Sequence, residues 1–242
     1  MAGAVLLAVA AVAAYCWLRY RGPGRTTGAR RPVAGRPGSR PIQGAGDSAD
    51  AHARELRTPG VRIATALGIS TRAERRARRF EIGAAGERYV ARLLEPLTAE
   101  GWVFLADCAL PRGRANVDLV GISPRGLVAV VDAKKWHRGF RLAVRGNRLL
   151  HDKKDVSDRM RGLDYEARTV ASLLNTPVVP VAAVVGPMLR GTQLRFRGIR
   201  LVPAEDAPEL LRGLDRRHLT TIPAARLVDT AQRLLPSKTT RR

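Results

Sequence analysis

The sequence predicts an α/β fold, in which a mixed β-sheet is flanked by helices and preceded by one N-terminal transmembrane helix and a disordered basic linker. Three observations support this prediction. Helix-like and strand-like patterns follow one another over residues 86–186 in the order helix, several strands, helix, strand, which is typical of a mixed sheet with helices on its faces. A hydrophobic content of 45% is sufficient for a packed core, and an uncharged apolar run precedes a stretch rich in Gly, Pro and Arg. We therefore divide the 242 residues into a membrane anchor (1–20), a linker (21–79), a central domain (80–190) and a C-terminal strand and helical extension (191–242).

The apolar run Ala2–Leu18 contains no charged residue and lies at the short limit for crossing a bilayer. A cleaved signal peptide is the alternative, but no Lys or Arg precedes the run. Arg19, Arg21 and Arg25 follow it, and the positive-inside rule then keeps the C-terminal body in the cytoplasm. We expect a single-pass protein of the cell membrane with its C-terminal domain in the cytoplasm.

Positive charge is concentrated in the linker. Between residues 19 and 79 the chain has fifteen Arg and four acidic residues, within a total net charge of +22. The first half of this segment has too few large apolar residues to offset its ordering entropy, so we expect disorder there. The charge favours a polyanionic partner, and both nucleic acid and anionic lipid headgroups fit. A short helix is expected over Ser70–Arg79, with Ser70 or Thr71 as its N-cap.

The first helix of the central domain is expected over Gly86–Leu97. Its apolar residues recur at helical spacing and form one stripe, made of Val90, Leu93, Leu94 and Leu97. Glu87 lies one turn before Val90 and therefore on the same side. An acid on the inward side of a helix suits a metal site. The alternative is that Glu87 only complements the dipole at the helix N-terminus.

Two short strands form the centre of the predicted domain, Asn116–Ile122 and Leu127–Lys134. Because strand side chains alternate between faces, Asp132 and Lys134 point the same way. Such groups at the end of an apolar strand cost desolvation free energy unless they are paired or bind a ligand. Carboxylates from adjacent strands, Asp118 and Asp132, can together hold a divalent cation. The pattern favours metal-assisted phosphodiester hydrolysis, with Lys134 orienting water or stabilising the transition state.

These motifs resemble the NERD (nuclease-related) domain of the PD-(D/E)xK nuclease superfamily. A Gly-x-x-Gly-Glu sequence ending at Glu87, the Asn-x-Asp ending at Asp118, and Asp132-Ala-Lys134 follow one another in the family order within residues 80–187. The resemblance implies a restriction-endonuclease-like fold, Mg²⁺ or Mn²⁺ as cofactor, and DNA more than RNA as substrate. It implies Glu87, Asp118 and Asp132 as metal ligands and Lys134 as a catalytic residue. Many nucleases of this fold act as homodimers, so a dimer is a further expectation.

Two departures from the family pattern stand out. The family more often has Glu where this chain has Asp132, and many relatives carry a Gln in the helix after the core. This chain has no Gln between residues 152 and 175. These departures are compatible with a protein that keeps the fold and has lost turnover.

Basic side chains around the hairpin are expected to contact phosphates. Trp136 could stack on a base, or it could pack inside the domain. A second hairpin is expected over Phe140–His151, a helix over Asp152–Leu174, and a strand buried on both faces over Pro177–Gly186. Further helices are expected over 204–214 and 223–235. The candidate nucleic-acid-binding residues are Arg114, Lys135, Trp136, Arg138, Lys153 and Lys154.

Three hypotheses about function remain open at this point. The first is a membrane-tethered, metal-dependent nuclease. The second is a nucleic-acid-binding or scaffold protein of the same fold without catalysis. The third is a basic protein of the membrane surface, which leaves the acid–lysine pattern unexplained.

Overall fold

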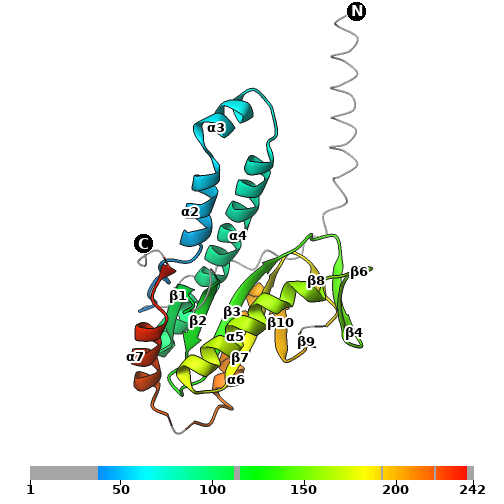
Figure 1. The fold of residues 1–242 in the computed structure, drawn as a ribbon. Coiled ribbons are helices and arrows are strands. Elements are labelled where there is room, and N and C mark those ends of the chain that lie inside the picture. Colours follow the sequence, from blue (N-terminus) through cyan, green and yellow to red (C-terminus); the bar gives the residue numbers. More distant parts are fainter. Residues whose placement is uncertain (1–37, 112–114, 192, 221, 239–242) are drawn as a thin grey trace, which may run out of the picture. The chain divides into compact units, whose positions relative to one another are not determined.

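A computed structural model describes residues 38–111, 115–191, 193–220 and 222–238 (Figure 1). Its centre is a six-stranded sheet in the order β1-β2-β3-β7-β10-β9, and a smaller sheet has the order β6-β5-β4-β8. The strands are β1 (Val103–Ala109), β2 (Asn116–Ile122), β3 (Val128–Lys135), β4 (Arg141–Arg145), β5 (Arg148–His151), β6 (Lys154–Asp155), β7 (Val178–Val185), β8 (Met188–Leu189), β9 (Leu194–Phe196) and β10 (Ile199–Pro203). The helices are α2 (Asp47–Leu56), α3 (Pro59–Ala66), α4 (Arg72–Leu94), α5 (Arg161–Leu174), α6 (Ala207–Asp215) and α7 (Ala224–Leu234), with short 3₁₀ helices η1 (Glu95–Glu100), η2 (Ser157–Met160) and η3 (Ala204–Asp206).

The predicted mixed sheet flanked by helices is confirmed. Strands β1, β2 and β3 form an antiparallel meander, whereas β3 pairs in parallel with β7, and β7 in parallel with β10. The connection from β3 to β7 contains the small sheet's hairpin and α5, as a parallel connection requires. The predicted strand over 177–186 is β7, which lies between β3 and β10 in the middle of the sheet.

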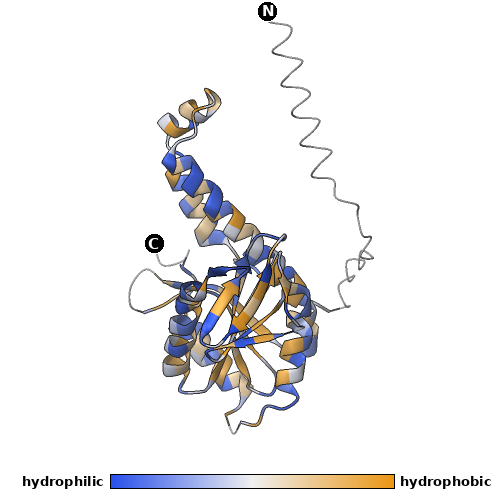
Figure 2. Cartoon of the chain, turned by 90° about the vertical axis from the view of Figure 1, so that its right-hand side faces the viewer, coloured by the Kyte–Doolittle hydropathy of each residue, from blue (hydrophilic) through white to orange (hydrophobic). Residues whose placement is uncertain are grey.

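Alternation along β3 divides the core between the two faces of the sheet. Val128 and Val130 pack in a cluster with residues of α5 and α7, and Ala129 and Val131 pack in a second cluster with residues of α4 and α6. Figure 2 shows the apolar colour of the central strands and the more polar colour of the helices around them. Because helices cover both faces of the sheet, a polar site can form only at the ends of its strands.

A helical arm made of α2, α3 and α4 extends from the sheet (Figure 1). The interpretation of residues 21–79 as a linker is therefore wrong for its second half, which forms α2, α3 and the start of α4. Ion pairs between the helices stabilise this arm. The Arg57 guanidinium pairs with Glu81 and donates a hydrogen bond of 2.9 Å to Glu74, so the arm's positive charge is partly neutralised. Buried Ala53 and Ala77 let α2 and α4 pack closely.

The start of α4 confirms one prediction and corrects another. Thr71 is the N-cap, and its hydroxyl accepts a hydrogen bond of 3.0 Å from the Glu74 amide. The helix then runs without interruption to Leu94, so it does not begin at Gly86 as predicted. Gly86 lies within this helix and faces β3, where an added Cβ would be 3.9 Å from the Ala133 Cβ, an ordinary packing distance, so this glycine does not initiate the helix.

The helix predicted over 152–174 begins later than expected. Asp152 has a positive φ of 57° and lies in a turn, and Lys154 belongs to the short strand β6. The helix α5 starts at Arg161, after η2. The hairpin over 140–151 and the two C-terminal helices are confirmed as β4–β5, α6 and α7.

The predicted membrane anchor over residues 1–20 and the first part of the linker lie outside the described residues. Within the described ranges, no helix is long and apolar enough to cross a membrane.

Candidate functional site

The ends of β2 and β3 bring together three of the residues predicted from the sequence. Asp132 is buried at 4% exposure, and its Oδ2 forms an ion pair with the Lys134 Nζ on the same face of β3. The two strands pair from Ile122↔Val128 to Leu119↔Val131. Continuing this register by one residue places Asp118 opposite Asp132, so two carboxylates meet at the end of the pairing.

Glu87 approaches the same place from α4. The residue before it, Gly86, is buried and faces Ala133 of β3, so this turn of the helix lies over β3. The Glu87 Oε2 is buried and has no hydrogen-bond partner in the part of the chain that the structure describes. Burial, together with the negative charges of Asp107 and Asp132, raises the pKa of Glu87 to about 7. A carboxylate in this state gains free energy from any cation that reaches it.

A fourth carboxylate, Glu166 on α5, was missed by the sequence analysis. Burial and the charge of Asp132 raise its pKa to about 7, whereas Lys134 acts in the opposite direction. Glu166 lies three residues after buried Leu163 and four before buried Val170. An acid on the inward stripe of a helix was therefore the available signal, the same signal that identified Glu87.

The cluster holds more negative charge than its lysine can balance. Burial raises the pKa of Asp118 well above its ordinary range, and the charges of Asp132, Glu87 and Glu166 add to the shift. Burial lowers the pKa of Lys134, but the charge and hydrogen bond of Asp132 outweigh it, and the pKa ends above its ordinary value. Lys134 is therefore protonated, and Glu87 and Glu166, each with a pKa of about 7, are partly protonated at neutral pH.

The donor set fits a hard divalent cation, because it consists of carboxylate oxygens and includes the unpaired Oε2 of Glu87. In the described ranges, however, no three Asp, Glu, His or Cys side chains converge closely enough to hold a metal ion as they stand. Lys134 contacts the Asp132 oxygen that a cation would use. Glu87, Asp118 and Asp132 thus fit a cation by chemistry, and their side chains must turn to meet it.

Asp107 on β1 is a second residue that the sequence analysis missed. It is fully buried and has a positive φ of 50°, which is uncommon for a residue other than Gly. Its carboxylate accepts hydrogen bonds from the Ser48 amide at 2.9 Å, the Ser48 hydroxyl at 2.7 Å and the Asn116 amide group at 2.8 Å. These bonds attach the base of the arm to the strands beside Asp118. No local pattern distinguishes this Asp from an ordinary turn residue.

A cleft of about 1150 Å³ opens between the arm and the ends of β1 and β2. Glu87 and Asp118 lie on its wall. Several basic side chains of the arm line it as well, namely His52, Arg54, Arg76 and Arg79. Within the described residues Arg54 and Arg79 form no ion pair, and Arg76 lies 5.9 Å from the centre of the Phe80 ring. The cleft therefore joins unpaired positive charge to the carboxylate cluster.

The predicted nucleic-acid contacts have different environments. Lys135, Arg138, Lys153 and Lys154 are exposed, so their role remains a prediction. Trp136 is 7% exposed and belongs to the core cluster, which supports the packing role and not base stacking. The guanidinium of Arg159 lies over its ring at 4.6 Å. Arg114 lies outside the described residues.

Comparison with known families gives one match. Residues 82–186 match the family model described as the nuclease-related domain (NERD), which covers α4 from Ile82 onward, the hairpin, α5 and β7. No curated protein and no solved structure matches the chain.

Proposed function

We propose that this chain, which carries a nuclease-related domain, is a metal-dependent nuclease that hydrolyses phosphodiester bonds in DNA in preference to RNA. The observation that carries the proposal is the pair of acids at the ends of β2 and β3, where Asp118 lies opposite Asp132 and Asp132 pairs with Lys134. Glu87 and Asp118 also line the cleft that the arm's arginines line. Asp132 is buried and the other acids are partly buried, so this excess of acids is costly for the fold. A bound divalent cation would offset part of this negative charge.

In this proposal Glu87, Asp118 and Asp132 hold Mg²⁺ or Mn²⁺. The bound cation would lower the pKa of a water and offset the charge that develops on the phosphate. Lys134, protonated and freed from Asp132, donates hydrogen bonds to a phosphate oxygen. Glu166, whose pKa of about 7 lies near neutral pH, accepts a proton at its carboxylate.

The proposed preference for DNA and the proposed homodimer both rest on the resemblance to the nuclease superfamily. The arginines of the cleft would contact phosphates, which DNA and RNA both contain, so the cleavage assay includes both polymers as substrates. Sedimentation of the full chain measures the oligomeric state. We also propose attachment to the cell membrane with the domain in the cytoplasm, on the basis of the apolar run 2–18 and the arginines that follow it.

The test is a cleavage assay with the full chain on plasmid, linear duplex, single-stranded DNA and RNA, each with Mg²⁺, Mn²⁺ or EDTA. Asp132→Asn and Lys134→Met should lower the rate by at least about a hundredfold, because each removes a group that contacts metal or phosphate. Asp229→Asn, an exposed acid on α7, is the matched control and should cut at the wild-type rate. Equal cutting by Asp132→Asn and the control would refute the assignment.

A second candidate function is a nucleic-acid-binding module without turnover. The ion pair between Lys134 and Asp132 favours it, because the lysine contacts an oxygen that a metal would need. This alternative predicts salt-sensitive binding of DNA and no site-specific heat of Mn²⁺ binding by calorimetry. A Mn²⁺ isotherm that disappears in Asp132→Asn would decide for the nuclease.

A further inference from the structure

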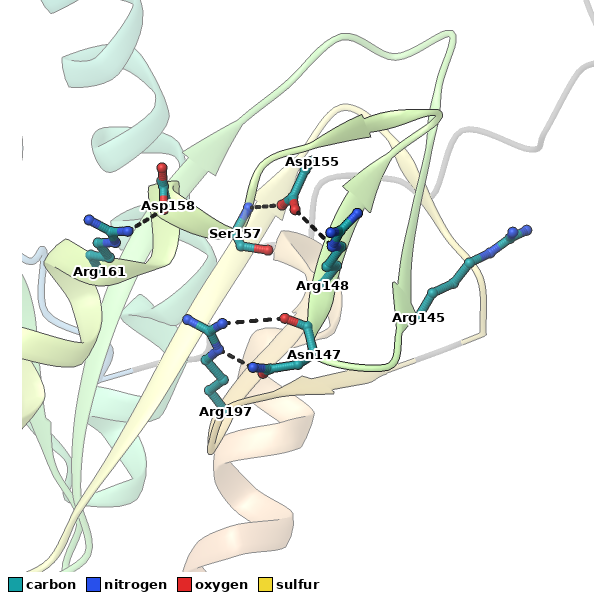
Figure 3. A pocket seen from close by; sticks show the side chains of 8 residues that line it. All are labelled: Arg145, Asn147, Arg148, Asp155, Ser157, Asp158, Arg161 and Arg197. Atoms are coloured by element: carbon teal, nitrogen blue, oxygen red, sulfur yellow. Dashed lines mark hydrogen bonds and ion pairs between the residues drawn. The ribbon is translucent and has the colours of Figure 1, made fainter.

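A second basic pocket, of about 570 Å³, lies beside the small sheet (Figure 3). It is formed by the β4–β5 hairpin, the segment from β6 to the start of α5, and the turn between β9 and β10. Its lining residues are Arg145, Asn147, Arg148, Asp155, Ser157, Asp158, Arg161 and Arg197. None of them belongs to the carboxylate cluster described above.

The arginines of this pocket are only partly neutralised. Arg161 pairs with Asp158 at 2.8 Å, and Arg148 lies 3.7 Å from Asp155. All four side chains in these pairs are largely exposed, so solvent weakens both pairs. The lining contains four arginines and two acids, which leaves a net charge of +2. In the described structure Arg145 has no partner and extends away from the others (Figure 3).

One arginine is held in position by the fold. Arg197 has a positive φ of 48° in the turn between β9 and β10. Its guanidinium donates to the Asn147 side chain at 2.8 Å and to the Asn147 carbonyl at 3.3 Å, as Figure 3 shows. These bonds join two separate turns and fix a donor fork whose remaining N–H groups are free to bind an oxyanion.

The pocket is connected to the candidate active site through η2. Ser157 and Asp158 line the pocket, whereas the next residue, Arg159, donates to the Lys135 carbonyl at 3.4 Å. The pKa of Arg159 is lowered by burial, and Asp132 acts against that shift, so Arg159 lies within electrostatic range of Asp132. The pocket therefore adjoins Arg159, which contacts β3 beside the carboxylate cluster, and it is a second basic surface besides the arm's cleft.

We propose that the pocket binds a phosphate group of the substrate's backbone, at a nucleotide away from the one that is cut. The inference rests on the proposed function for the identity of the substrate. It adds a second point of attachment, so that the strand is held on both sides of the reacting phosphate. Two points fix the direction of the strand through the site, which one basic surface cannot do.

Binding in EDTA tests this inference, because it needs no cleavage. Anisotropy of a labelled 20-base-pair duplex, measured with the full chain over a range of salt, gives the dependence of affinity on ionic strength. The double variant Arg148→Gln/Arg161→Gln should reduce the slope of log K against log salt by about 0.9, since the pocket would lose its contact with one phosphate. The control Arg226→Gln/Arg233→Gln removes the same charge from exposed positions on α7 and should keep the wild-type slope.

A gain of affinity provides the second arm. Asp158→Asn frees Arg161 and should tighten duplex binding several-fold, a result that damage to the fold cannot produce. If Arg148→Gln/Arg161→Gln and the control Arg226→Gln/Arg233→Gln weaken duplex binding equally, only the total charge of the protein matters and the pocket is not a phosphate-binding site. If inorganic phosphate binds the wild type but not Arg148→Gln/Arg161→Gln, and duplex affinity is unchanged, the pocket serves free phosphate and the inference is overturned. If the chain cuts no substrate in the cleavage assay, it can still show the expected salt dependence in this binding assay. The proposed nuclease activity and the proposed phosphate-binding pocket can therefore be refuted independently.

Discussion

Replacing Glu166 by Gln removes one buried carboxylate from beside Lys134 and keeps the shape of the side chain. In the wild type the pKa of Glu166 is raised from 4.5 to about 7, first by burial and then by the charge of Asp132. The folded state therefore holds a proton that the unfolded chain releases at lower pH. The stability associated with that proton is fully present below about pH 4.5 and is lost as the pH rises through 7.

The size of the effect follows from the two pKa values. Between pH 5.5 and pH 8 this single group should cost the wild type about 2 kcal/mol of unfolding free energy. The Gln variant carries no such penalty, so its advantage over the wild type should grow by about 2 kcal/mol over the same range. For a protein of this size that corresponds to roughly 4–8 °C in melting temperature.

The assay is urea or thermal denaturation in EDTA at both pH values, with Glu209→Gln as the control. Glu209 is an exposed acid on α6 whose pKa is lowered by its hydrogen bond to Arg216, so it stays ionised in both states across this range. Its variant should show no change in pH dependence. If Glu166→Gln and the wild type differ by the same amount at pH 5.5 and pH 8, Glu166 does not lie buried among acids and the electrostatic account of the site is wrong.

Three further predictions follow from the described contacts. Mn²⁺ binding should tighten from pH 6 to pH 8 and release protons, because Glu87, with a pKa of about 7, must ionise before it binds the cation. Calorimetry in buffers of different ionisation enthalpy measures the number of protons released. The variant Glu87→Gln should release fewer protons than the wild type. Gly186→Ala should lower the unfolding free energy by about 3 kcal/mol in urea titrations, because φ is 115° and the added Cβ would collide with the Trp136 carbonyl oxygen. The control Gly146→Ala also has a positive φ, 55°, but no atom lies near its added Cβ, so it should lower the unfolding free energy by only about 1 kcal/mol. Arg57→Ala should speed hydrogen exchange in α2 and α3 and leave β3 and β7 unchanged, and uniform exchange across both regions would show that the pairing with Glu74 does not hold the arm.

The hairpin at the centre of the site could be predicted because its signal is local. Asp132 and Lys134 share a face by simple alternation, and Asp118 is brought to them by a short turn. Glu166 and Asp107 required knowledge of which elements pack together. Their positions depend on how α5 lies on the sheet and how the arm reaches β1, and neither contact is local in sequence.

The arm shows why composition alone misled the prediction. The first half of the linker is poor in large apolar residues, and disorder was expected there; in the second half a helix was expected only over residues 70–79. The second half contains Glu74 at a position where a helical hairpin can pair it with Arg57, and Glu81 just beyond the linker makes a second pair. Counting charges gives their sum and not their partners, so a segment whose helices are joined by the Arg57 ion pairs and capped at Thr71 resembled one that merely repels itself.

The bond between Ser48 and Asp107 also sets the order in which the molecule can be completed. Its two residues are 59 positions apart, whereas α2, α3 and α4 contact one another over short stretches of chain. During synthesis the arm emerges first and can form its helices alone, but its base has nothing to bind until β1 and β2 have been made. The cleft is therefore assembled late. A chain interrupted before the strands would present a basic helical hairpin, and no cluster of acids, to any polyanion nearby.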